Sequence, residues 1–171
     1  MEVGWPQAIV LLVALQRVAE LVVSHRNTKR LKAAGALEHG AAHYPLFVLL
    51  HGGWLASLFF LVPATAPIHL GWLGLFVLLQ GARVWVLLSL GPNWSTRVLS
   101  MPGRKLVARG PYRWLRHPNY LIVVLEIAAL PLVFGSAALA LIFTLLNAGL
   151  IAHRIHVEDK ALAASRGSSG G

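Results

Sequence analysis

Five apolar stretches follow one another along the chain, and each has about the length that crosses a membrane. They cover residues 5–23, 44–62, 70–90, 119–134 and 136–152. A helix needs roughly 20 predominantly apolar residues to cross the hydrocarbon core of a bilayer. Basic residues gather after the first, third and fifth stretches, and short turns follow the second and fourth. The pattern predicts an all-α polytopic membrane protein, a bundle of about five transmembrane helices.

The composition excludes several other classes of protein. Hydrophobic residues make up 57% of the 171 residues and charged residues 12%, whereas about a quarter of an ordinary soluble domain is charged. There is no cysteine, which excludes disulfide scaffolds, thiolate metal sites and cysteine nucleophiles. A glycine-rich strand–turn–helix signature is also absent, so we expect no Rossmann domain.

The basic residues predict the orientation. Thirteen of the 15 Lys and Arg residues follow the first, third and fifth stretches, and an odd number of helices places these segments on one side. The positive-inside rule makes that side cytoplasmic. We expect a protein of the inner (plasma) membrane, with its N-terminus outside and its C-terminus and active site inside. Orientation and contact with anionic membrane lipids account for the net charge of +9, so we expect no nucleic-acid partner.

A few polar residues interrupt the apolar stretches, where burying a charge is costly. Arg17 and Glu20 are three residues apart in the first stretch, and we expect them to neutralise each other. Arg83 and Glu126 belong to different stretches, and we expect a buried ion pair between those helices. His51 is expected to be a hydrogen-bonded core histidine.

The segment before the fourth stretch carries the first group of candidate functional residues. Gly110-Pro111 marks a turn, and Pro118 suits the first turn of a helix. The unpaired amides at that helix entrance, with His117, Tyr120 and nearby arginines, would hold a carboxylate or phosphate. The alternative is an interfacial loop of topology signals and aromatic anchors, which we favour for Arg113 and Trp114. For the run 116–120 we favour function.

The fifth helix and its exit carry the second group. One helix face holds four residues at spacings of 4, 3 and 4: Asn147, Ile151, Arg154 and Glu158. An acid four residues after an arginine is the less favourable order for stabilising a helix, so we interpret Arg154 and Glu158 as facing an anion and a cation. The alternative is a partly solvated ion pair worth at most about 1 kcal/mol. His153 and His156 lack enough further ligands at suitable spacing, so we expect no metal site.

Several of these residues together resemble the isoprenylcysteine carboxyl methyltransferase family, especially its short bacterial membrane members. The resemblance covers about residues 91–162 and rests on Leu106-Val107, Gly110-Pro111-Tyr112, Arg116-His117-Pro118-Asn119-Tyr120 and Arg154-x-x-x-Glu158. It implies one membrane-embedded methyltransferase domain over residues 1–164, with the cofactor site within 91–162. Residues 165–171, rich in Gly and Ser, are expected to form a flexible tail.

The resemblance also implies the cofactor and the role of each site residue. S-adenosylmethionine would lie in a cytoplasm-facing pocket between the loop before the fourth helix and the end of the fifth. The residues that correspond to its contacts are Arg104, Lys105, Leu106, Val107, Tyr112, His117, Pro118, Asn119, Tyr120 and Glu158. Arg154 corresponds to the residue that positions the methyl acceptor, so it is the candidate catalytic and substrate-binding residue, together with Asn147 on its helix face. Arg97 replaces a glutamine of the eukaryotic enzymes, and we leave it out of the site.

The chemistry of these residues suits an O-methyltransferase that acts on a lipophilic acceptor. The helix entrance suits the carboxylate of S-adenosylmethionine, and Glu158 suits its ammonium group. Arg154 can hold an anionic oxygen, and orientation and exclusion of water then supply most of the rate. The acceptor would be a carboxylate, phenol or enol. The resemblance to the bacterial members implies a polyketide-derived phenolic lipid or an alkylpyrone, in preference to an isoprenylcysteine-like lipid. Two alternatives remain: a phospholipid amine N-methyltransferase, which Arg154 disfavours, and a non-enzymatic membrane scaffold.

Overall fold

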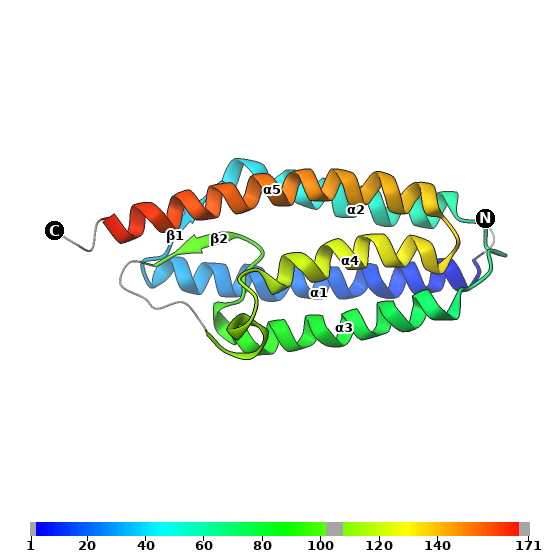
Figure 1. The fold of residues 1–171 in the computed structure, drawn as a ribbon, viewed down its shortest axis with the longest axis horizontal. Helices are drawn as coiled ribbons and strands as arrows, with labels where there is room; N and C mark the ends of the chain where they lie inside the picture. Colours follow the sequence, from blue (N-terminus) through cyan, green and yellow to red (C-terminus); the bar gives the residue numbers. More distant parts are fainter. Residues whose placement is uncertain (1–2, 102–107, 168–171) are drawn as a thin grey trace.

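Five helices that alternate in direction form an elongated bundle (Figure 1). The computed structural model describes residues 3–101 and 108–167, with side chains up to residue 160. The helices are α1 (Trp5–Ala33), α2 (Tyr44–Leu61), α3 (Leu70–Leu90), α4 (Pro118–Val133) and α5 (Ala137–Gly167). The strands are β1 (Leu37–His39) and β2 (Val98–Ser100), and the 3-10 turns are η1 (Ala41–His43), η2 (Gly91–Asn93) and η3 (Gly110–Arg113). The predicted all-α bundle is confirmed.

The length and composition of the helices are those of a multi-pass membrane protein. Within the described ranges, four helical segments are long and apolar enough to cross a bilayer: Trp5–Ala33, Ala41–Leu61, Leu70–Asn93 and Ala137–Lys160. The fifth helix, α4, has 16 residues and is therefore about 24 Å long, less than the roughly 30 Å of hydrocarbon in a bilayer. Large apolar side chains such as Leu12, Leu78 and Leu145 are exposed on the outside of the bundle, where lipid would cover them.

Two helices run further than the apolar pattern predicts. The first stretch, residues 5–23, gives too short a helix, because α1 continues through the basic residues to Ala33 and ends only before Gly35, whose φ is +92°. Polar residues end an apolar stretch but do not break a helix, whereas a glycine at positive φ does. Likewise α5 reaches Gly167, so the predicted tail begins within that helix, and its last four residues lie outside the described chain.

The basic segments share one end of the bundle. The C-terminal ends of α1 and α5 and the two strands lie together at the end opposite the N-terminus (Figure 1). There β1 pairs antiparallel with β2, with Leu37 opposite Ser100. This pairing of two strands that are far apart in the sequence was not predicted, because each strand has only three residues. Burial alone would raise the pKa of Glu38 in β1, but hydrogen bonds and charge from Lys32 and Arg97 outweigh that effect and lower it.

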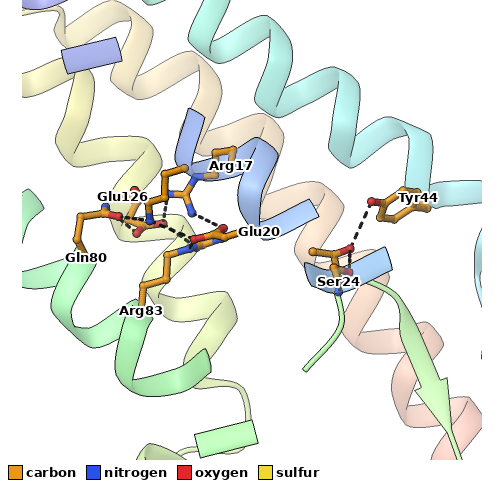
Figure 2. Close-up of polar contacts among 9 residues, drawn as sticks. Arg17, Glu20, Ser24, Tyr44, Gln80, Arg83 and Glu126 are labelled. Atoms are coloured by element: carbon orange, nitrogen blue, oxygen red, sulfur yellow. Dashed lines mark hydrogen bonds and ion pairs between the residues drawn. The ribbon is translucent and has the colours of Figure 1, made fainter. Parts of the chain in front are cut away.

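A buried charge network joins α1, α3 and α4 (Figure 2). Arg83 donates two hydrogen bonds to Glu20, at 2.7 and 2.6 Å, and a third to Glu126 at 2.9 Å. Arg17 also bonds both carboxylates, at 3.0 and 2.9 Å, and Gln80 donates to Glu126. Both predicted ion pairs are confirmed, but they form a single network of two arginines and two glutamates. The opposite charges balance, which makes their burial tolerable.

Candidate functional site

The start of α4 lies short of the end that α1 and α5 reach (Figure 1), so the last turns of α5 pass the entrance of α4. Pro118 is the first residue of α4 and is fully buried. His117 precedes it with φ −131° and ψ 60°, a non-helical backbone of the kind expected before proline. No side chain caps this helix. Pro118 has no N–H, and the N–H groups of Tyr120 and Leu121 bond the carbonyl of His117. Within the described part of the chain, the amide of Asn119 is therefore the one in this first turn that is available to an anion.

Tyr120 links the two groups of predicted site residues. Its phenol Oη donates a hydrogen bond to Glu158 Oε2 at 2.7 Å and accepts one from Arg154 Nε at 2.9 Å. The ring of His117 stacks on Tyr120 with 5.1 Å between centroids, and His117 Nδ1 lies 3.8 Å from Glu158 Oε2. Arg154 and Glu158 of α5 were predicted to face an anion and a cation. In the structure both bond the hydroxyl of Tyr120, which joins them to the mouth of α4, and they do not bond each other directly.

Arg154 is held on several sides. Its Nη2 donates to the backbone carbonyl of Thr96 at 2.6 Å, and its guanidinium carbon lies 5.1 Å from the centre of the Phe47 ring and 5.4 Å from that of Tyr120. Thr96 is in turn anchored to α1, since its Oγ1 lies 2.7 Å from Ser24 Oγ. Figure 2 shows Ser24 beside Tyr44, whose hydroxyl is 3.3 Å from Thr96 Oγ1.

Thr96 was not among the residues predicted for the site, although its carbonyl accepts a hydrogen bond from Arg154. It acts on Arg154 through its backbone carbonyl, which every residue type carries, so no residue pattern marks it. Its contacts to Ser24 and Tyr44 join segments about 50 to 70 positions apart in the chain. The orientation of Arg154 therefore depends on a loop that α1 and α2 hold in place. These two helices lie outside residues 91–162, where the cofactor site was expected.

The remaining predicted cofactor residues fall into three groups. Tyr112 lies in η3 near Glu158, and burial together with the charge of that carboxylate raises the pKa of Tyr112 to about 12. Its phenol is therefore a neutral donor at physiological pH. Asn119 Oδ1 and His117 Nε2 are buried and have no hydrogen-bond partner among the described atoms. Arg104, Lys105, Leu106 and Val107 lie outside the described residues.

Asn147 lies on the face of α5 that carries Arg154, about two turns deeper in the bundle. Its side chain is fully buried, and neither Oδ1 nor Nδ2 has a partner in the described part of the chain. An unpaired buried polar group costs about 1–3 kcal/mol. The structure therefore leaves the amide of Asn147 available. No hydrogen bond joins it to the Tyr120 cluster, which consists of Tyr120, His117, Arg154 and Glu158.

Gly110 sets the position of η3 and thereby of Tyr112. Its φ is +55°, and a Cβ there would lie 2.1 Å from Ser89 Oγ and 3.2 Å from Trp85 Nε1. We expect Gly110→Ala to lower the thermal unfolding temperature in detergent, because left-handed backbone costs an L-residue roughly 1–2 kcal/mol before any clash. Gly81→Ala on α3 is the matched control, since a Cβ there meets nothing within 4 Å. Equal unfolding temperatures for the two variants would contradict this role of Gly110.

Comparison with known proteins adds two findings. The sequence model of the isoprenylcysteine carboxyl methyltransferase (ICMT) family matches residues 72–164, a range that contains Tyr120, Arg154 and Glu158. The chain is also 37% identical over 163 residues to the uncharacterized protein YpbQ of Bacillus subtilis (strain 168), a match that covers 90% of this chain and 94% of YpbQ. No solved structure matches significantly.

Proposed function

The chain belongs to the isoprenylcysteine carboxyl methyltransferase family, and from that premise we propose that it is an S-adenosylmethionine-dependent O-methyltransferase acting on a lipophilic acceptor with an acidic oxygen. Membership suggests a membrane methyltransferase with a lipophilic substrate. The cofactor, the reaction at oxygen and the placement of the site at the cytoplasmic face of the inner membrane are our proposal.

The residues around Tyr120 fit S-adenosylmethionine by their chemistry. Glu158 offers a carboxylate for the ammonium group, and the Asn119 amide at the uncapped start of α4 offers a donor for the carboxylate. The unpartnered buried atoms His117 Nε2 and Asn119 Oδ1 are further polar groups that a ligand would satisfy. When bound, the cofactor supplies a methyl group on a sulfonium. We assign it to Arg104, Lys105, Leu106, Val107, Tyr112, His117, Pro118, Asn119, Tyr120 and Glu158.

Arg154 is assigned to the acceptor. Nε and Nη2 are used by Tyr120 and Thr96, while Nη1 has no hydrogen-bond partner among the described residues and can hold an anionic oxygen. A permanent cation at this position repels an amine, so it supports methylation of oxygen over nitrogen. Asn147 is the polar group that the acceptor would meet deeper between the helices. The acceptor would arrive laterally from the bilayer, and the basic end of the bundle would contact anionic lipids of the cytoplasmic leaflet.

One observation carries this proposal: Tyr120 binds a carboxylate suited to an ammonium group and a guanidinium suited to an anionic oxygen. The test uses purified protein in detergent with methyl-labelled S-adenosylmethionine and a membrane lipid extract. We expect the label in a lipid that is heavier by one methylene unit and esterified or etherified at oxygen. Label in an amine headgroup would instead support the N-methyltransferase, and an unlabelled extract without cofactor binding would support the scaffold.

A further inference from the structure

A pocket lies next to Arg154, between the paired strands β1 and β2, the start of α2 and α5. Its wall includes His43, Tyr44, Phe47, Thr96, His153 and Arg154. Phe47 faces one side of the guanidinium and lines this pocket, whereas Tyr120 faces the guanidinium without lining it. Arg154 thus lines this pocket and also bonds Tyr120 in the proposed donor site. A group bound here would reach the guanidinium from the side of Phe47.

Two of the histidines in this pocket have no other role in the structure. The rings of His43 and His153 meet edge to face, with 4.2 Å between centroids. Neither ring has a hydrogen-bond partner among the described residues, and His43 Nδ1 is buried without one. By contrast, the third histidine of the wall, His39, is engaged with Ser100 Oγ at 2.7 Å. The pocket therefore holds a pair of imidazoles that can accept a proton.

We propose that this pocket receives the head group of the methyl acceptor, and that the His43–His153 pair accepts the hydroxyl proton when that head group is a phenol or a weakly acidic enol. This inference rests on the proposed methyltransferase function. A carboxylate is already ionised at neutral pH and needs no base, whereas a phenol has a pKa of about 10 and does. Imidazole changes its charge near neutral pH and is the commonest general base in enzymes.

The proton and the electrons balance in this step. As the acceptor oxygen forms its bond to the methyl carbon of the sulfonium donor, the carbon–sulfur bond breaks and its electron pair stays on sulfur. The hydroxyl proton moves to a ring nitrogen of the histidine pair and is later released to water. Arg154 faces the oxygen while its negative charge develops, which is where a fixed cation stabilises a transition state most.

Charged and titratable groups from every element around the pocket line it together with the histidine pair. They are Glu38 and His39 from β1, Tyr44 from α2, Arg97 next to β2, and Arg154 from α5. Glu38 is already paired with Lys32 and Arg97, and Arg97 lies 4.1 Å from the centre of the Tyr44 ring. The histidine pair thus shares its pocket with Arg154 and with the charged residues of β1 and β2.

The test compares two lipids with the same alkyl chain, one a plain phenol and the other a nitrophenol that is ionised at the assay pH. We expect His43→Gln and His153→Gln together to slow methylation of the phenol by about 100-fold, the range of general base catalysis, and to leave methylation of the nitrophenolate close to wild type. His156→Gln, on the same helix but outside the pocket wall, should change neither. Retained nitrophenolate turnover also shows that the double variant is folded.

A second readout needs no methyl donor. Nitrophenol lipid bound to the wild-type protein should ionise at a lower pH than lipid bound to the double variant, as followed by phenolate absorption, because an imidazolium stabilises the phenolate. Equal loss on both lipids, or no difference in the pH of ionisation, would overturn the role of the pair. If the wild type methylates only a carboxylate lipid, the substrate class is wrong but the methyltransferase proposal stands. If it methylates no lipid and binds no donor, the proposed function itself fails.

Discussion

Glu126→Gln is expected to lower the free energy of unfolding by about 3–5 kcal/mol, the usual cost of removing one partner from a buried ion pair. Glu126 is 2% exposed near the middle of α4 and accepts hydrogen bonds from Arg17, Arg83 and Gln80. The substitution leaves two buried arginines facing one carboxylate, that of Glu20. Because Glu126 connects α4 to α1 and α3, the loss should weaken the bundle as a whole.

Thermal unfolding in detergent checks this expectation, and two variants serve as controls. Arg17→Gln combined with Glu126→Gln restores charge balance and keeps the two-bond contact between Arg83 and Glu20, so it should be more stable than Glu126→Gln alone. Asp159→Asn removes an ion pair with Arg116 that is largely exposed, and it should change stability little. Wild-type stability of Glu126→Gln, or a double variant less stable than the single, would contradict the network as described.

Arg154→Lys is expected to reduce turnover by about 100-fold, because a lysine cannot reproduce the planar contacts of a guanidinium and small misplacements in an active site cost that much. Arg154 bonds Tyr120 and Thr96 while lying between the rings of Phe47 and Tyr120. A single ammonium group retains the charge but loses that orientation. The affinity for S-adenosylmethionine should stay near wild type, because Glu158 and the entrance of α4 remain.

Steady-state kinetics and cofactor titration together separate these two effects. Arg113→Lys is the matched control: Arg113 is exposed in η3 beside Trp114 and contacts no member of the Tyr120 cluster in the described chain. It should keep wild-type turnover. Arg154→Lys with unchanged turnover would remove Arg154 from the acceptor role, and a parallel loss of cofactor affinity would place it in the donor site instead.

Part of this architecture could be predicted from the pattern of residues. Apolar stretches of membrane length predicted the helices, and charges at membrane depth predicted that Arg83 meets Glu126 and that Arg17 meets Glu20. The merging of the two pairs could not be predicted, since it depends on the rotation and depth of three helices. The extension of α1 past residue 23 was missed because apolar content predicts where lipid ends and not where a helix ends.

For the candidate site, helical spacing put Arg154 and Glu158 on one face, and the proline at 118 predicted a helix entrance. That the two lie side by side was implied by the family resemblance. That these groups meet follows from short connections between neighbouring helices. The contacts of the Tyr120 hydroxyl and of the Thr96 carbonyl could not be predicted. Both depend on how separate segments of the chain are placed relative to one another in the fold. The pairing of β1 with β2 beside the pocket of His43 and His153 was missed because both strands are too short to produce an alternating pattern.

Calorimetric titration of the purified protein with S-adenosylmethionine tests whether the mouth of α4 and the end of α5 bind this cofactor. We predict saturable binding by the wild type and by Asp159→Asn. Glu158→Gln should bind about 10- to 100-fold more weakly, because it loses a charge-assisted hydrogen bond to the ammonium group. A wild-type protein that binds no cofactor would contradict the proposed site. A Glu158→Gln variant that binds it as tightly as wild type would contradict the role of Glu158.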